Sequence, residues 1–138
     1  MRIAIAIMVM AAPGMLSGQG APKINKVGVS PTSPASGKEM FHAYCASCHG
    51  VDAKGNGPAA AALKKPPSDL TALAKNSGGT FPALLVRSSI KDGTQAGHGS
   101  KDMPVWGPIL SSVSGDNPGV VDQRISNLVG YVQSIQVK

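Results

Sequence analysis

The feature that most restricts what this chain can fold into is its pair of cysteines, Cys45 and Cys48, followed directly by His49. The chain contains no other cysteine. A disulfide between two residues so close together would close a very short loop and would not connect distant parts of the fold. A structural disulfide is therefore a poor explanation. Three chemistries remain for this C-x-x-C-H sequence: zinc binding, thiol–disulfide exchange and covalent attachment of a haem.

Two of these three chemistries do not suit this sequence, one for lack of ligands and the other because of where the cysteines lie. A structural zinc site takes about four ligands. Besides the two thiols, the chain offers only His42, His49 and His98, and it has no second C-x-x-C. Thiol–disulfide exchange needs the cysteine pair at a helix N-terminus, where the helix dipole lowers the thiol pKa. Here the pair follows a predicted helix.

The C-x-x-C-H pattern is the attachment signature of a c-type haem. Two thiols one helical turn apart can both bond to the haem, and the adjacent imidazole of His49 then supplies one axial ligand to the iron. The iron has a second axial position. Met103 stands in a glycine-rich loop, residues 92–104, directly before Pro104, and we predict that it is the second ligand. His98 in the same loop is the rival, and a gap-filling apolar role for Met103 is the third possibility.

The cysteine pair lies at the end of a predicted helix. Ser36 and Glu39 have the spacing of a capping box, which predicts a helix over residues 37–47 that runs into Gly50. Its buried face would carry Gly37, Met40, Phe41, Tyr44 and Cys45.

The rest of the chain also favours helices. Shorter helices are predicted over residues 69–74, capped by Ser68, and 81–90, capped by Thr80. A helical turn, interrupted by Pro108, is predicted within residues 105–112. The strongest pattern follows Asn117-Pro118 and predicts a helix that ends near Val137. Its apolar residues recur at helical spacing: Val121, Ile125, Leu128, Val132 and Ile135. No alternating strand appears, so we predict an all-α domain of about four to five helices.

The N-terminal part of the chain predicts export. Residues 1–20 contain Arg2, a short apolar run and then small and polar residues, which is the order of a signal peptide. The apolar run is too short to span a bilayer comfortably, although an uncleaved anchor is the alternative. Residues 21–35 are predicted to be a flexible linker and residues 36–138 the folded domain. We therefore expect a periplasmic or otherwise exported protein.

Composition supports a prosthetic group and excludes one class of partner. The chain has only five aromatic residues, two Phe, two Tyr and one Trp, so a bulky group that is not an amino acid would help to fill the core. The formal net charge is +6, but the lysines are dispersed and no basic run is interleaved with aromatics. Nucleic-acid binding is therefore not expected. Dispersed positive charge can still steer an acidic partner.

Over residues 36–136 the sequence resembles the monohaem class I c-type cytochromes of bacterial periplasms. Gly37 and Phe41 precede Cys45 at the spacing that this family uses. Leu128 and Tyr131 match the leucine and the aromatic that pack the last helix onto the first. Met103-Pro104 looks like the distal ligand of the family.

The resemblance implies the cytochrome c fold around one covalent haem c, held by Cys45 and Cys48, with His49 and Met103 as iron ligands. It also implies that the Pro58 carbonyl accepts the imidazole N–H, and that Trp106 lines the haem edge, unless Trp106 only fills the core. The implied function is one-electron transfer between periplasmic or membrane redox partners of a respiratory chain, by a carrier rather than an enzyme. The alternatives are a haem subunit of a larger dehydrogenase or oxidase and a haem-based ligand sensor.

Overall fold

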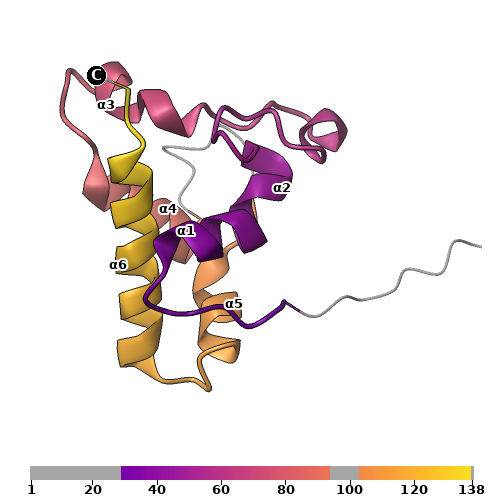
Figure 1. The fold of residues 1–138 in the computed structure, drawn as a ribbon, viewed down its shortest axis with the longest axis vertical. Coiled ribbons are helices and arrows are strands. Elements are labelled where there is room, and N and C mark those ends of the chain that lie inside the picture. The colour runs from indigo at the N-terminus through magenta and orange to yellow at the C-terminus, as the bar shows by residue number, and fades with distance from the viewer. Residues whose placement is uncertain (1–28, 94–102, 138) are drawn as a thin grey trace, which may run out of the picture.

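The computed structural model describes residues 29–93 and 103–137. Within these two ranges the chain forms helices joined by turns and no strand, as predicted (Figure 1). The α-helices are α1 (Gly37–Met40), α2 (Ala46–His49), α3 (Leu73–Asn76), α4 (Ala83–Asp92), α5 (Trp106–Ser112) and α6 (Pro118–Ser134). No helix in the described ranges is both long enough and apolar enough to cross a membrane. The predicted signal peptide and His98 lie outside the described residues.

The first helix is continuous and carries the cysteines at its end. A π-helical turn, η1 (Phe41–Cys45), joins α1 directly to α2. Ser36 is the N-cap, and its hydroxyl oxygen accepts a hydrogen bond from the Glu39 backbone N–H at 3.1 Å, as the capping box predicts. The Glu39 carboxylate reaches further back and accepts from the Ser33 N–H at 3.3 Å. The helix stops at Gly50, whose φ of +79° is one that glycine adopts without strain.

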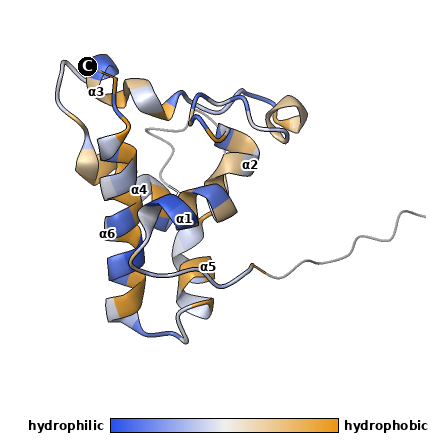
Figure 2. Ribbon diagram, in the orientation of Figure 1, coloured by the Kyte–Doolittle hydropathy of each residue, from blue (hydrophilic) through white to orange (hydrophobic). Residues whose placement is uncertain are grey.

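The last helix has both of its predicted features. The Asn117 side-chain oxygen accepts from the N–H groups of Gly119 and Val120, at 3.0 and 3.3 Å, and Pro118 is the first helical residue. Its predicted apolar face is turned inward, with Ile125, Leu128 and Val132 buried. Figure 2 shows that hydrophobic and hydrophilic residues both occur along the whole of α6. The helix ends at Ser134, slightly earlier than predicted.

The first and last helices cross, which the family resemblance implied. The Phe41 and Tyr131 ring centroids lie 5.2 Å apart. A Cβ atom at Gly37 would lie only 2.0 Å from the Asn127 backbone oxygen, so α1 and α6 approach as closely as they do because residue 37 has no side chain (Figure 1). This crossing fixes the position of the helix that bears the cysteines.

Two of the predicted helix starts were wrong. The short 3-10 helix η3 (Leu70–Ala72), which runs into α3, is capped by Asp69 and not by Ser68, because the Asp69 carboxylate accepts from the Thr71 N–H at 2.8 Å. The helix predicted from Phe81 begins at Ala83 as α4. Thr80 therefore lies outside its cap, and Pro82 occupies the cap position without a side-chain hydrogen bond.

The predicted interruption of the helix at residues 105–112 was also wrong. Pro108 is the third residue of α5. The first N–H groups of a helix have no partner within that helix, so a proline there removes no hydrogen bond. The helix therefore runs through to Ser112.

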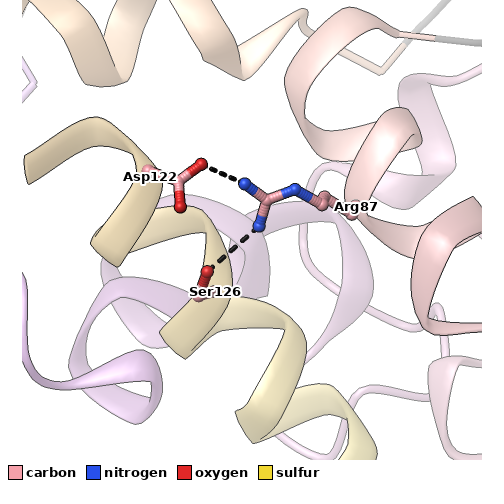
Figure 3. Close-up of polar contacts among 3 residues, drawn as sticks. All are labelled: Arg87, Asp122 and Ser126. Atoms are coloured by element: carbon pink, nitrogen blue, oxygen red, sulfur yellow. Dashed lines mark hydrogen bonds and ion pairs between the residues drawn. The ribbon is translucent and has the colours of Figure 1, made fainter. Parts of the chain in front are cut away.

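An ion pair ties α4 to α6 across the surface. The Arg87 guanidinium contacts the Asp122 carboxylate and donates to the Ser126 hydroxyl at 3.0 Å (Figure 3). These partners lie one turn apart on α6, so a single side chain of α4 contacts that helix at two points. The helix α4 is thereby held beside the core.

Part of the segment predicted as a linker lies against the domain. The Tyr44 hydroxyl donates to the Ser30 carbonyl at 2.8 Å, and the Asn127 amide donates to the Pro34 carbonyl at 2.8 Å. Arg124, only 4% exposed on α6, donates to the Thr32 hydroxyl at 3.0 Å. Residues 30–34 are therefore held to the helices by hydrogen bonds.

Candidate functional site

The two cysteines lie on adjacent turns at the end of the first helix. Cys45 ends the π-helical turn, Cys48 lies on α2, and both are half-buried thiols without a disulfide. Burial, with a smaller contribution from Cys48, raises the pKa of the Cys45 thiol to about 12. Thiol–disulfide exchange needs the opposite, a thiol whose pKa is lowered. The environment of Cys45 thus disfavours the exchange chemistry, in agreement with the sequence argument.

His49 is buried and points its ring in a defined direction. Its Nδ1 lies 3.2 Å from the Ser68 carbonyl oxygen. Because a carbonyl only accepts, this contact requires the hydrogen to be on Nδ1, so Nε2 is the ring nitrogen whose lone pair could bind a metal. The implied partner was Pro58, and that expectation was wrong. Any residue offers a backbone carbonyl, so the sequence held no signal for Ser68.

The loop after His49 folds back and donates hydrogen bonds to the C-terminal end of the helix. The Gly57 N–H donates to the Cys48 carbonyl at 3.0 Å, and the Ala59 N–H donates to the Ser47 carbonyl at 2.8 Å. A Cβ atom at Gly57 would lie 2.4 Å from the Ser47 oxygen, so this close return of the chain requires glycine. The loop satisfies carbonyls that a helix leaves without partners at its C-terminus.

The segment that receives His49 is stabilised by its own cap. Hydrogen bonds from Thr71, helped by the nearby Lys54, hold the pKa of Asp69 below its usual value. The carboxylate therefore stays charged at neutral pH and keeps η3 folded. Because Ser68 and Leu70 are the neighbours of Asp69 in the sequence, this cap also fixes the Ser68 carbonyl and the Leu70 side chain.

Two adjoining hollows open beside the motif, of about 100 Å³ and 260 Å³. Both are lined by Cys45, His49 and Met103, and the second is lined by Cys48 as well, so the structure brings the four predicted site residues together. Cys48 lines only the second hollow. The larger hollow alone exceeds the roughly 150 Å³ of an apolar cavity that admits benzene. The site thus has room for a group much larger than a side chain.

The lining of the first hollow is largely apolar. Its hydrophobic walls come from four parts of the fold and include Phe41, Leu70, Val86, Ile90, Leu128 and Val132. An apolar cavity with a few placed polar or ligating atoms is the ordinary form of a cofactor site. A haem, with an apolar ring and an iron that accepts imidazole nitrogen and thioether sulfur, fits this donor set.

Aromatic side chains form the wall of the second hollow. Trp106 is half-buried and stacks on Tyr44, with ring centroids 5.3 Å apart and an interplanar angle of 25°. Both residues line this hollow together with Lys65 and Pro66. Trp106 therefore lines the second hollow and also packs on the core through Tyr44.

The zinc alternative gains no support. Among residues 29–93 and 103–137, no group of three or more His, Cys, Asp or Glu side chains is arranged to hold a metal ion. An iron that is carried by a macrocycle needs only the two axial ligands from the protein. The described part of the site fits such an iron and does not fit a four-ligand zinc site.

Comparison with known proteins agrees with this chemistry. The family model described as "Cytochrome C oxidase, cbb3-type, subunit III" matches residues 32–117. The curated protein cytochrome c-554(547) of Halothiobacillus neapolitanus is 30% identical over 104 residues, which cover 74% of this chain and 96% of that protein. No solved structure gives a significant match.

Proposed function

Since the chain belongs to the c-type cytochromes with one haem, we propose that Cys45 and Cys48 attach the haem and that His49 and Met103 bind its iron. The observation that carries this assignment is the cavity that Cys45, His49 and Met103 line together. Cys48 adjoins His49 on the same helix. The four residues thus combine two attachment points with one nitrogen and one sulfur ligand.

The protein is a haem-based electron carrier and not an enzyme. Haem c supplies a one-electron exchange between ferric and ferrous iron. The chain provides the surroundings: Ser68 orients the His49 ring, and largely apolar walls line the first hollow. A soft thioether from Met103 favours the ferrous state relative to a second histidine. If His49 and Met103 both bind the iron, it would have no open position for a substrate.

Replacing Met103 tests the ligand assignment. The wild-type protein, expressed with its N-terminal segment in a host that matures c-type cytochromes, should show a far-red ferric absorption band from sulfur-to-iron charge transfer. In Met103→Ala this band should vanish while the haem stays covalently bound. Met40→Leu is the matched control, because Met40 is buried in the core on α1 and the exchange conserves volume. Its band should persist.

The opposite result has a definite meaning. If wild-type protein lacks the far-red band, Met103 is not the ligand. His98, or an open position, then completes the coordination. An open position would also bind carbon monoxide readily, and a ligand sensor would become the better assignment.

We further propose that the partners are redox proteins with acidic docking surfaces in the periplasm. Members of this family act with redox partners and are typically exported. The chain carries a net charge of +6, and Lys65 lines the second hollow, preceded in the sequence by the exposed Lys64. Positive charge near the site would speed the encounter with an acidic surface.

Salt should therefore slow electron transfer to an anionic probe. We expect the rate of ferricyanide reduction to fall as ionic strength rises from about 0.01 M to 1 M, since the screening length shrinks about tenfold over this range. Lys65→Gln should weaken the salt dependence, and Lys38→Gln on α1 should not. A rate that is independent of salt would remove electrostatic steering from the proposal.

A subunit role is the second candidate function. The matched family model is named for subunit III of a cbb3-type cytochrome c oxidase. Purification of the tagged protein from its native membranes distinguishes the two. Stoichiometric co-purification with an oxidase would establish a subunit, and recovery as a single chain would establish a free carrier.

A further inference from the structure

One buried hydroxyl in the structure lacks a partner. Ser89, on α4, is 1% exposed, and its Oγ atom has no hydrogen bond. Among the described residues it is the single buried side-chain nitrogen or oxygen in this state. Buried polar groups in native proteins nearly always have a partner, so an orphan needs an explanation.

The position of Ser89 points to the site. It lines the first hollow, together with His49 and Met103, and is the serine of α4 that does so. Its neighbour Ser88 is different, since the Ser88 hydroxyl donates to the Leu85 carbonyl at 3.0 Å within the same helix. Ser89 therefore offers a hydrogen-bond donor to whatever occupies an otherwise largely apolar cavity.

Three of the residues assigned to the haem and its iron line this cavity, and two of them are held in place. Cys45 and His49 lie on the continuous helix formed by residues 37–49, and neither is a partner of Ser89. The close crossing of that helix with α6 at Gly37 holds both residues in place. Met103 lies outside any helix, and its side chain has three rotatable bonds. Its sulfur is the acceptor that can approach.

We propose that the Ser89 hydroxyl donates a hydrogen bond to the Met103 sulfur when that sulfur binds iron, and that this bond raises the reduction potential. The inference rests on the proposed ligation by Met103. A hydrogen bond draws electron density from the sulfur and so weakens its donation to the iron. Ferric iron depends on that donation more than ferrous iron does. The hydrogen bond therefore stabilises the ferrous state relative to the ferric state. Ser89 is thus a positioning residue that acts through Met103.

Potentiometric titration of the holoprotein tests the proposal. Ser89→Ala should shift the ferric-to-ferrous ratio at fixed potential about threefold toward ferric, in line with one modest hydrogen bond. At 59 mV per tenfold for one electron, this is a potential lower by about 28 mV. The far-red ferric band should shift but persist. Ser89→Thr keeps the hydroxyl and should restore the potential, and Ser88→Ala should leave it unchanged.

A double variant identifies the acceptor. In a Met103→Ala background, Ser89→Ala should no longer lower the potential, because the sulfur is gone. An equal shift in both backgrounds would overturn the proposal. So would an unchanged potential in Ser89→Ala while the far-red band is present. Absence of the far-red band from wild-type protein would instead reject Met103 ligation itself, so the two failures are distinct.

Discussion

Replacing Gly37 with alanine should cost the folded protein at least about 3 kcal/mol, since no side chain can be accommodated there without separating two helices. The added Cβ would lie 2.0 Å from the Asn127 oxygen and 2.9 Å from the Tyr131 Cβ. The Asn127 oxygen belongs to the backbone of α6 and cannot rotate away. Because α1 continues into the cysteine motif, the displacement would also reach Cys45.

Chemical denaturation of the holoprotein, monitored by far-UV circular dichroism, measures this cost. Gly130→Ala is the matched control, because Gly130 is an exposed residue of α6 and a Cβ there meets nothing within 4 Å. That change should stabilise the protein by about 0.5 to 1 kcal/mol through helix propensity. If Gly37→Ala were as harmless as Gly130→Ala, the close crossing of α1 and α6 would be wrong.

Removing both cysteine thiols should abolish covalent haem. The Cys45→Ala/Cys48→Ala variant, expressed where c-type cytochromes mature, should carry no haem that remains with the chain on a denaturing gel stained for haem. Non-covalent binding through His49 and Met103 would not survive denaturation. The expected loss is complete, because the described residues include no other thiol.

Ser47→Ala provides the control for this experiment. Ser47 lies between the two cysteines and is exposed. Its replacement changes the sequence of the motif without removing a thiol, so covalent haem should be retained at the wild-type level. Haem that stayed with the denatured double variant would contradict attachment through Cys45 and Cys48.

Several features of this protein were predictable because they depend on residues close together in the sequence. The Ser36 cap spans one helical turn, and Asn117-Pro118 starts α6 in the same local way. The inward face of α6 follows from a period of 3.6 residues. The pairing of Gly37 and Phe41 with the last helix came from a family pattern, and the Phe41–Tyr131 contact confirms it.

The details of the shorter helices were harder to predict. Ser68 and Asp69 are both good capping residues, and only the path of the chain decides which of them caps η3. Pro108 was predicted to interrupt the helical turn within residues 105–112, but α5 begins at Trp106 and the proline lies in its first turn. A proline in the first turn is tolerated, whereas one in the middle of the helix is not.

The sequence by itself was enough to predict the chemistry of the site. Cys45, Cys48 and His49 lie within about one helical turn, so their relative positions follow from their spacing in the sequence. The predicted role of Met103 likewise came from its place in a loop before Pro104. Tertiary structure alone decided what surrounds these residues. The Ser68 carbonyl on His49, the buried Arg124 against residues 30–34, and the unpartnered Ser89 hydroxyl all arise from contacts between distant segments. Such contacts leave no periodic signal, because they depend on how helices pack and not on the order of neighbouring residues.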